Sequence, residues 1–95
     1  MTTRPERPKV GNRVRCTITG IKGNCGWGHK VGDQFEVSTH DTAGMCGIFF
    51  HDIYPRIAVL QFGGAYPWGD KDILRVECPD RFNCVQAELK RLPPE

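Results

Sequence analysis

The stretch MCGIFFHDIYPRIAVLQF, residues 45–62, decides the fold, because it is the best candidate for a helix in the chain. Its large apolar residues recur at helical spacings and would form one stripe against a sheet: Phe49, Phe50, Ile53, Ile57 and Leu60. Pro55 interrupts this pattern. A proline inside a helix removes a hydrogen bond and clashes with the preceding turn, although it is tolerated at the first helical position. The segment therefore predicts either one kinked helix or two short helices, at about 45–53 and 55–61.

Four short segments around this helix alternate apolar and polar residues, which is typical of strands with one buried face: 13–21, 34–38, 72–78 and 83–92. The resulting order is β-β-α-β-β. It predicts a small α+β domain, in which an antiparallel sheet of about four strands carries the kinked or split helix on one face. Because the other face of such a sheet is left partly bare, the pattern also favours a homo-oligomer.

The length of 95 residues predicts one domain, over residues 13–92, with a flexible basic N-terminal arm at 1–12 and a C-terminal tail at 93–95. No apolar run approaches the roughly 18 residues of a membrane span, and no apolar stretch follows the basic N-terminus to make it a secretory signal. We therefore expect a cytoplasmic protein without a membrane partner. A nucleic-acid partner is not expected, because the basic residues gather in a proline-containing arm and not on a broad face with aromatics.

The five cysteines divide by their positions in these elements. Their number is odd and no secretory signal precedes them, so a disulfide framework is not expected. Cys16 lies among the inward-facing residues of the first strand and is predicted to fill the core. Cys84 points to the solvent side of the last strand and is predicted to be incidental. Cys25, Cys46 and Cys78 lie at the ends of elements, where distant segments of a compact domain can meet.

A metal site is the first hypothesis. Cys25 and His29 are four positions apart in the glycine-rich loop stretch NCGWGHKVGD, residues 24–33. With Cys46 and Cys78 they supply three thiolates and one imidazole, a common closed zinc set. The sequence thus predicts a small metal-binding protein that holds one ion of zinc or iron. Four protein ligands would make the ion structural, whereas an open position would support Lewis-acid chemistry.

A metal-free enzyme is the second hypothesis. Thiols at helix N-termini ionise more readily than free ones, and Cys46 directly precedes the predicted helix. A thiolate beside His29, or beside His51, is the pair that nucleophilic or acid–base catalysis needs, with Asp33 or Asp52 to orient the imidazole. His29 is the better partner, because His51 lies well round the helix from Cys46. The reaction would be of the isomerase, lyase or decarboxylase type, on a small organic molecule.

The walls of a small-molecule pocket would come from two loops. Trp27 and Trp68 lie in loops beside glycine and proline, where an indole can form a lid or cap the end of a small core. The Gly63–Gly64 turn would complete these walls. A third hypothesis is a binding module without chemistry, built on the helix face and the basic arm.

Three stretches together resemble a conserved hypothetical family of small microbial single-domain proteins: GNCGWGHKVGDQFEV (23–37), AGMCGIFFHDIYPRIAVLQFGGAYPW (43–68) and VECPD (76–80). The motifs of that family are Cys-Pro-x-Gly-His-x-x-Gly-Asp, Gly-x-Cys-Gly, Gly-Gly-x-x-Pro-Trp and Cys-Pro-Asp, and the match covers roughly residues 13–91. The resemblance implies that the following residues belong to the family pattern: Cys25, His29, Gly32, Asp33, Cys46, Gly47, His51, Pro55, Gly63, Gly64, Pro67, Trp68 and Cys78. It implies no particular activity. This chain has glycine at position 26, where the family has proline, and Trp27 follows, which implies a modified pocket.

Overall fold

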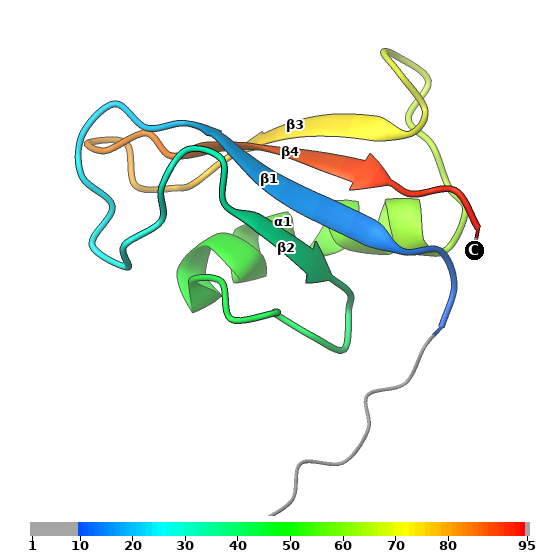
Figure 1. Cartoon of the computed structure of the whole chain (residues 1–95). Helices are drawn as coiled ribbons and strands as arrows, with labels where there is room; N and C mark the ends of the chain where they lie inside the picture. The colour runs from blue at the N-terminus through cyan, green and yellow to red at the C-terminus, as the bar shows by residue number, and fades with distance from the viewer. Residues whose placement is uncertain (1–9, 95) are drawn as a thin grey trace, which may run out of the picture.

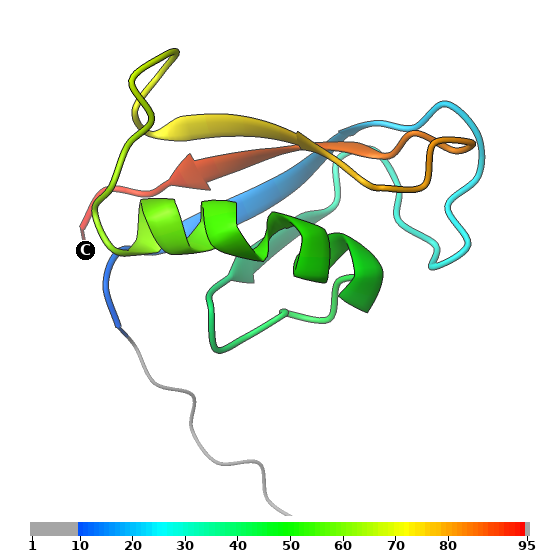
Figure 2. The same ribbon diagram turned by 180° about the vertical axis from the view of Figure 1, so that it is seen from behind.

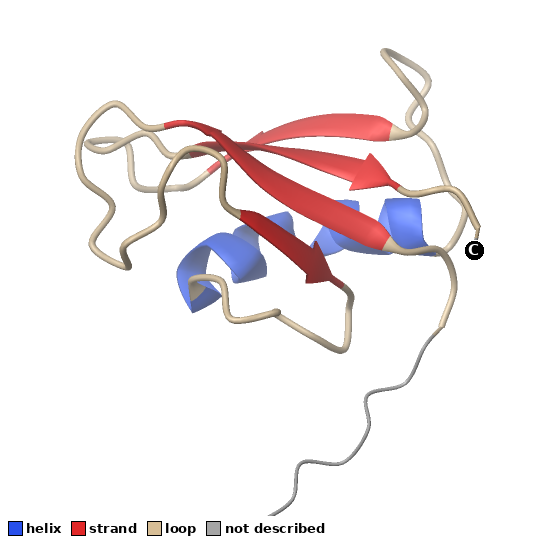
Figure 3. Ribbon diagram, viewed as in Figure 1, coloured by secondary structure: helices blue, strands red, loops and turns tan. Residues whose placement is uncertain are grey.

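The computed structural model describes residues 10–94 as a sheet with one helix. The strands are β1 (Val14–Gly20), β2 (Gln34–Val37), β3 (Ile73–Glu77) and β4 (Gln86–Arg91). They form one antiparallel sheet in the order β2-β1-β4-β3 (Figures 1 and 3). Helix α1 (Gly47–Gln61) connects β2 to β3 and lies across one face of the sheet (Figure 2). The predicted α+β class and the β-β-α-β-β order are confirmed.

The core lies between α1 and the facing side of the sheet. Alternate strand residues and one side of the helix supply its buried apolar side chains, which include Val14, Cys16, Ile18, Val37, Val76, Ala87, Leu89, Phe49, Ile53, Ile57 and Leu60. This set matches the period of two expected of strands and the stripe expected of the helix. The predicted core position of Cys16 is confirmed, and burial raises the pKa of its thiol to about 12.

The helix is continuous, so the chain does not form the two short helices that were one of the predicted alternatives. Pro55 lies inside α1 and is exposed, as is His51 one turn before it. A proline at position 55 has no N–H to donate to the carbonyl of residue 51. Because position 55 lies on the side of α1 that faces away from the core, the missing hydrogen bond does not disturb the packing of the helix on the sheet.

The last strand begins later than predicted, at Gln86 in place of residue 83. Cys84 has a positive φ of 49° and donates its N–H to the carbonyl of Asp80, at 3.0 Å. Its thiol donates to the carbonyl of Arg81, at 2.8 Å. Residues 80–84 therefore form a turn, and Cys84 belongs to that turn and not to the solvent side of a strand.

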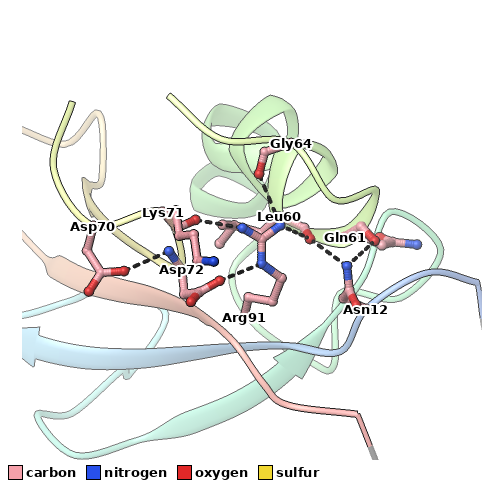
Figure 4. Close-up of polar contacts among 8 residues, drawn as sticks. All are labelled: Asn12, Leu60, Gln61, Gly64, Asp70, Lys71, Asp72 and Arg91. Atoms are coloured by element: carbon pink, nitrogen blue, oxygen red, sulfur yellow. Dashed lines mark hydrogen bonds and ion pairs between the residues drawn. The ribbon is translucent and has the colours of Figure 1, made fainter. Parts of the chain in front are cut away.

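The C-terminal end of α1 is tied to the sheet by Arg91 (Figure 4). Its guanidinium donates to the carbonyls of Leu60 and Gly64, each at 3.0 Å, and to the carbonyl of Lys71, at 2.7 Å. It also pairs with the carboxylate of Asp72, at 2.8 Å. Carbonyls at a helix C-terminus lack partners inside the helix, and a cation there interacts favourably with them.

The chain before β1 is also held at this end of the helix. Gln61 is fully buried, and its side-chain amide donates to the carbonyl of Val10, at 2.9 Å, and accepts from the N–H of Thr39, at 2.8 Å. Asn12 donates its N–H to the carbonyl of Gln61, at 2.7 Å. Residues 10–12 of the predicted arm therefore contact the domain, and residues 1–9 of that arm lie outside the described residues. No helix within residues 10–94 has the length and apolar character needed to cross a membrane.

Candidate functional site

Three of the predicted site cysteines lie in segments that meet at one end of the molecule. The loop 21–33 joins β1 to β2, the turn 78–85 joins β3 to β4, and α1 begins on the same side (Figure 1). Cys25 lies in the loop, Cys78 directly follows β3, and Cys46 is the N-cap residue of α1. All three side chains are partly buried and pack against the core.

Asn83 holds the two connecting segments together. Its carbonyl accepts the N–H groups of Lys22 and Gly23, at 2.8 and 3.1 Å, and its side-chain oxygen accepts the N–H of Asn24, at 3.1 Å. The side-chain amide of Asn83 donates to the carboxylate of Asp80, at 2.8 Å. That hydrogen bond holds the pKa of Asp80 below its ordinary value. The segment directly before Cys25 is therefore fixed to the turn that follows Cys78.

His29 reaches from the same loop to the beginning of the helix. It is only 5 % exposed, and its ring packs edge-on against Phe35, with ring centroids 5.2 Å apart. Its Nε2 accepts the backbone N–H of Cys46, at 3.1 Å. Since Nε2 is the acceptor, the neutral imidazole carries its proton on Nδ1. Burial lowers the pKa of His29 below 6.5, and the nearby charge of Asp33 opposes this shift.

The thiol of Cys78 interacts electrostatically with the other two. Burial raises its pKa above the ordinary value, while a hydrogen bond from the backbone N–H of Asp80 lowers it. Negative charge on Cys46, Asp80 and Cys25 raises it further. Such an effect falls off with distance, so Cys25 and Cys46 lie within electrostatic range of Cys78.

A complete metal site is not assembled in this structure. Within residues 10–94, no group of three or more His, Cys, Asp or Glu side chains is arranged so that it could hold an ion directly. The predicted set of Cys25, His29, Cys46 and Cys78 therefore does not form one coordination shell here. One physical reason is that Nε2 of His29 already accepts a hydrogen bond from Cys46. The donor atoms that are left are the three thiols.

The other predicted residues near this end have separate contacts. Asp33 accepts the N–H of Lys30, at 2.9 Å, which closes the turn, and it makes no hydrogen bond to the imidazole of His29. Trp27 is 60 % exposed and donates its indole N–H to the carbonyl of Gly44, at 3.3 Å. His51 is exposed on α1, without a hydrogen bond or ion pair in the described chain, so it does not join Cys46.

The predicted pocket walls lie at opposite ends of α1. Gly63 and Gly64 end the helix, where Gly63 has a positive φ of 82° and Gly64 donates to the carbonyl of Val59, at 2.8 Å. Trp68 stacks on Tyr66 at the rim of a cavity of about 710 Å³. A helix of 15 residues is about 22 Å long, so these residues cannot share a small pocket with Trp27 and Cys46.

Two contacts of this site were not predicted from the sequence. The hydrogen bond from Cys46 to His29 and the bonds of Asn83 to the loop both join residues far apart in the chain. The sequence does carry a local signal for the second, because Asp80 followed three residues later by Asn83 is typical of a turn. It carries no signal that the turn would bind residues 22–24.

Comparison of the chain with protein-family models, with curated proteins and with solved structures finds no match in any of the three.

Proposed function

We propose that the protein binds one metal ion through the thiolates of Cys25, Cys46 and Cys78. The observation that carries this proposal is that the three partly buried cysteines lie in segments that meet at one end of the domain and pack against the same core. Three thiolates close together repel each other, and a cation between them removes that repulsion. Thiolate donors favour zinc, iron in clusters and monovalent copper. Zinc is the first choice and iron the second.

The thiols would have to move closer on binding, because they do not form a ready coordination shell. The chain next to two of them has room for such a movement. A Cβ atom added at Gly26, beside Cys25, or at Gly47, beside Cys46, would meet no atom within 4 Å. Metal binding would therefore order this end of the molecule and release the protons of the thiols, as is usual when an ion completes a site.

His29 has a positioning role in this proposal and is not a fourth ligand. It holds the N–H of Cys46 and so fixes the start of α1 beside the loop of Cys25. Three protein ligands leave the fourth position of a tetrahedral ion open to water or to a small molecule. An ion bound in this way supports Lewis-acid chemistry when that position is occupied by a substrate.

Cobalt(II) titration and thiol protection test the proposal together. The reduced protein should bind about one ion per chain, with the strong absorption of thiolate-bound cobalt, and zinc should displace it. Bound zinc should slow alkylation of Cys25, Cys46 and Cys78, and replacement of any of them by serine should weaken binding by at least about tenfold. Cys84→Ser is the matched control, because this partly buried thiol lies in the turn and is not part of the set; it should bind normally.

The same measurements separate this proposal from a metal-free enzyme that uses Cys46 and His29. Nε2 of His29 accepts a backbone N–H and is not free to take the proton of the Cys46 thiol, so the geometry favours the metal site. If the protein takes up no cobalt or zinc and its thiols alkylate at the same rates with and without zinc, the metal proposal is wrong. Alkylation at Cys46 that is much faster than at Cys25 and Cys78, and insensitive to zinc, would support the enzyme.

A further inference from the structure

The outward side of α1 carries large apolar residues beside the exposed His51, although it faces away from the core. Ile48, Pro55 and Phe62 are spaced seven residues apart, which is close to two helical turns, and so they lie on one face. Ile48 is 69 % exposed and Phe62 is 58 % exposed. Neither a strand nor a second helix of the described chain lies over this side (Figure 2).

Apolar residues thus lie on both sides of the helix. The inward side carries the buried core residues Phe49, Ile53, Ile57 and Leu60. An exposed stripe of large apolar side chains marks a surface that another molecule covers. We name the residues Ile48, Pro55 and Phe62 the outer stripe.

Two opposite charges flank the outer stripe on one side. Asp52 and Arg56 are one helical turn apart, and both are exposed on the side of α1 that borders a cavity of about 730 Å³ beside β3. Neither side chain makes a hydrogen bond or ion pair in the part of the chain that the structure describes. The flank therefore presents an unpaired anion and an unpaired cation.

We propose that the outer stripe is the interface with a second copy of this chain, in which two α1 helices pack antiparallel about a two-fold axis beside Pro55. Ile48 and Phe62 are equally far from Pro55 along the helix, so this axis sets Ile48 of each copy against Phe62 of the other. A two-fold interface requires this kind of self-complementary surface.

The charges favour the same axis. The midpoint of Asp52 and Arg56 falls at residue 54, next to Pro55, and a two-fold axis there keeps the charged flanks of both copies on the same side. Asp52 of one copy then lies beside Arg56 of the other, twice in the dimer. A parallel two-fold pairing would instead put the two charged flanks on opposite sides of the interface, where Asp52 of one copy does not meet Arg56 of the other.

Sedimentation equilibrium of the full chain, over a range of concentrations and with reductant and chelator present, tests the proposal. Reductant and chelator exclude dimers made by disulfides or by shared metal ions. The chain should dimerise reversibly, and Ile48→Glu or Phe62→Glu should raise the dimer Kd by at least about tenfold, because each places a charge in the apolar contact. Phe82→Glu is the control, because Phe82 is 92 % exposed in the turn before β4 and should leave the Kd unchanged.

A charge exchange tests the antiparallel register. Asp52→Arg alone should weaken the dimer, since it sets two cations side by side, whereas Asp52→Arg combined with Arg56→Asp should restore it. Far-UV circular dichroism checks that each variant is folded. A monomer at every concentration would overturn the proposal. The occupant of the outer stripe to test next would then be residues 1–9 of the same chain. A dimer that Ile48→Glu leaves intact, or one that the charge exchange does not rescue, would overturn it as well.

Discussion

His29 holds the start of α1 only while its imidazole is neutral, because Nε2 needs its lone pair to accept the N–H of Cys46. Burial lowers its pKa below 6.5, with Asp33 opposing the shift. The unfolded chain, whose histidine has an unperturbed pKa, therefore takes up this proton at a higher pH than the folded chain. The stability that His29 contributes is present above pH 6.5 and is lost as the pH falls through the lowered pKa of the folded state.

Replacing His29 by alanine should lower the free energy of unfolding by about 1–2 kcal/mol above pH 6.5, since the N–H of Cys46 loses its acceptor. The difference from the original protein should shrink as the pH falls, because protonation removes the same acceptor from the original. Urea unfolding, followed by tryptophan fluorescence over a pH series, measures both effects. His51→Ala is the control, since His51 is exposed and unpartnered in the described chain and should give no pH-dependent difference.

The sequence indicated that Cys25, Cys46 and Cys78 lie at the ends of elements, and the structure places all three at one end of the molecule. The positions of these cysteines could be predicted because the periodic apolar residues of strands and helices show where each element ends. The acceptor role of His29 leaves no periodic pattern in the sequence. It depends on how a glycine-rich loop approaches the start of a helix 17 residues later. A histidine in a loop looks the same in the sequence whether its lone pair meets an ion, a thiol or a backbone N–H.

The turn between β3 and β4 is hydrogen-bonded to the loop of Cys25, so a substitution in the turn should also change the mobility of that loop. Asn83→Ala removes one acceptor for the N–H of Asn24 and one donor to Asp80, while the backbone bonds from Lys22 and Gly23 remain. We expect the loop of Cys25 to loosen and Cys25 to alkylate several times faster in the metal-free protein, as an opening that is easier by about 1 kcal/mol implies.

Mass spectrometry of the alkylated protein measures this effect site by site. Asn24→Ala is the matched control, because it shortens an exposed side chain and keeps the backbone N–H that Asn83 accepts. Equal rates at Cys25 in the original protein and the Asn83→Ala variant would show that the backbone bonds alone hold the loop.

Helix and strands differ in how far the sequence predicted them. The alternation of Val14, Cys16 and Ile18 gave the phase of β1 correctly, because each of these side chains is buried. Of the two alternatives predicted at Pro55, the split into two short helices is wrong, since α1 runs through residue 55. The apolar stripe of the helix already put residue 55 on the side away from the core. The late start of β4 was not predictable from alternation, because Cys84 continues the pattern while its backbone adopts a positive φ.

The thiols come from segments that are far apart in the sequence and meet only when the whole domain is folded. An ion that binds them therefore binds the folded chain and not the unfolded one, apart from weak binding to free thiols, and it must stabilise the entire molecule. At zinc concentrations about 100 times the Kd this stabilisation is about 2.7 kcal/mol. For a domain of this size such a gain raises the melting temperature by at least about 10 °C.

Thermal unfolding of the reduced protein, at one protein concentration with and without zinc, should show this rise. Cys25→Ser should cut the rise to about half or less, as binding weakened at least tenfold implies. It should change the melting temperature without zinc only slightly, because the side chain is partly exposed in a loop. Cys84→Ser should keep the full rise. A fixed protein concentration matters, since the dimer proposed above also makes the melting temperature depend on concentration. If zinc raises the melting temperature of Cys25→Ser as much as that of the original chain, the ion binds elsewhere and the three thiols are not its site.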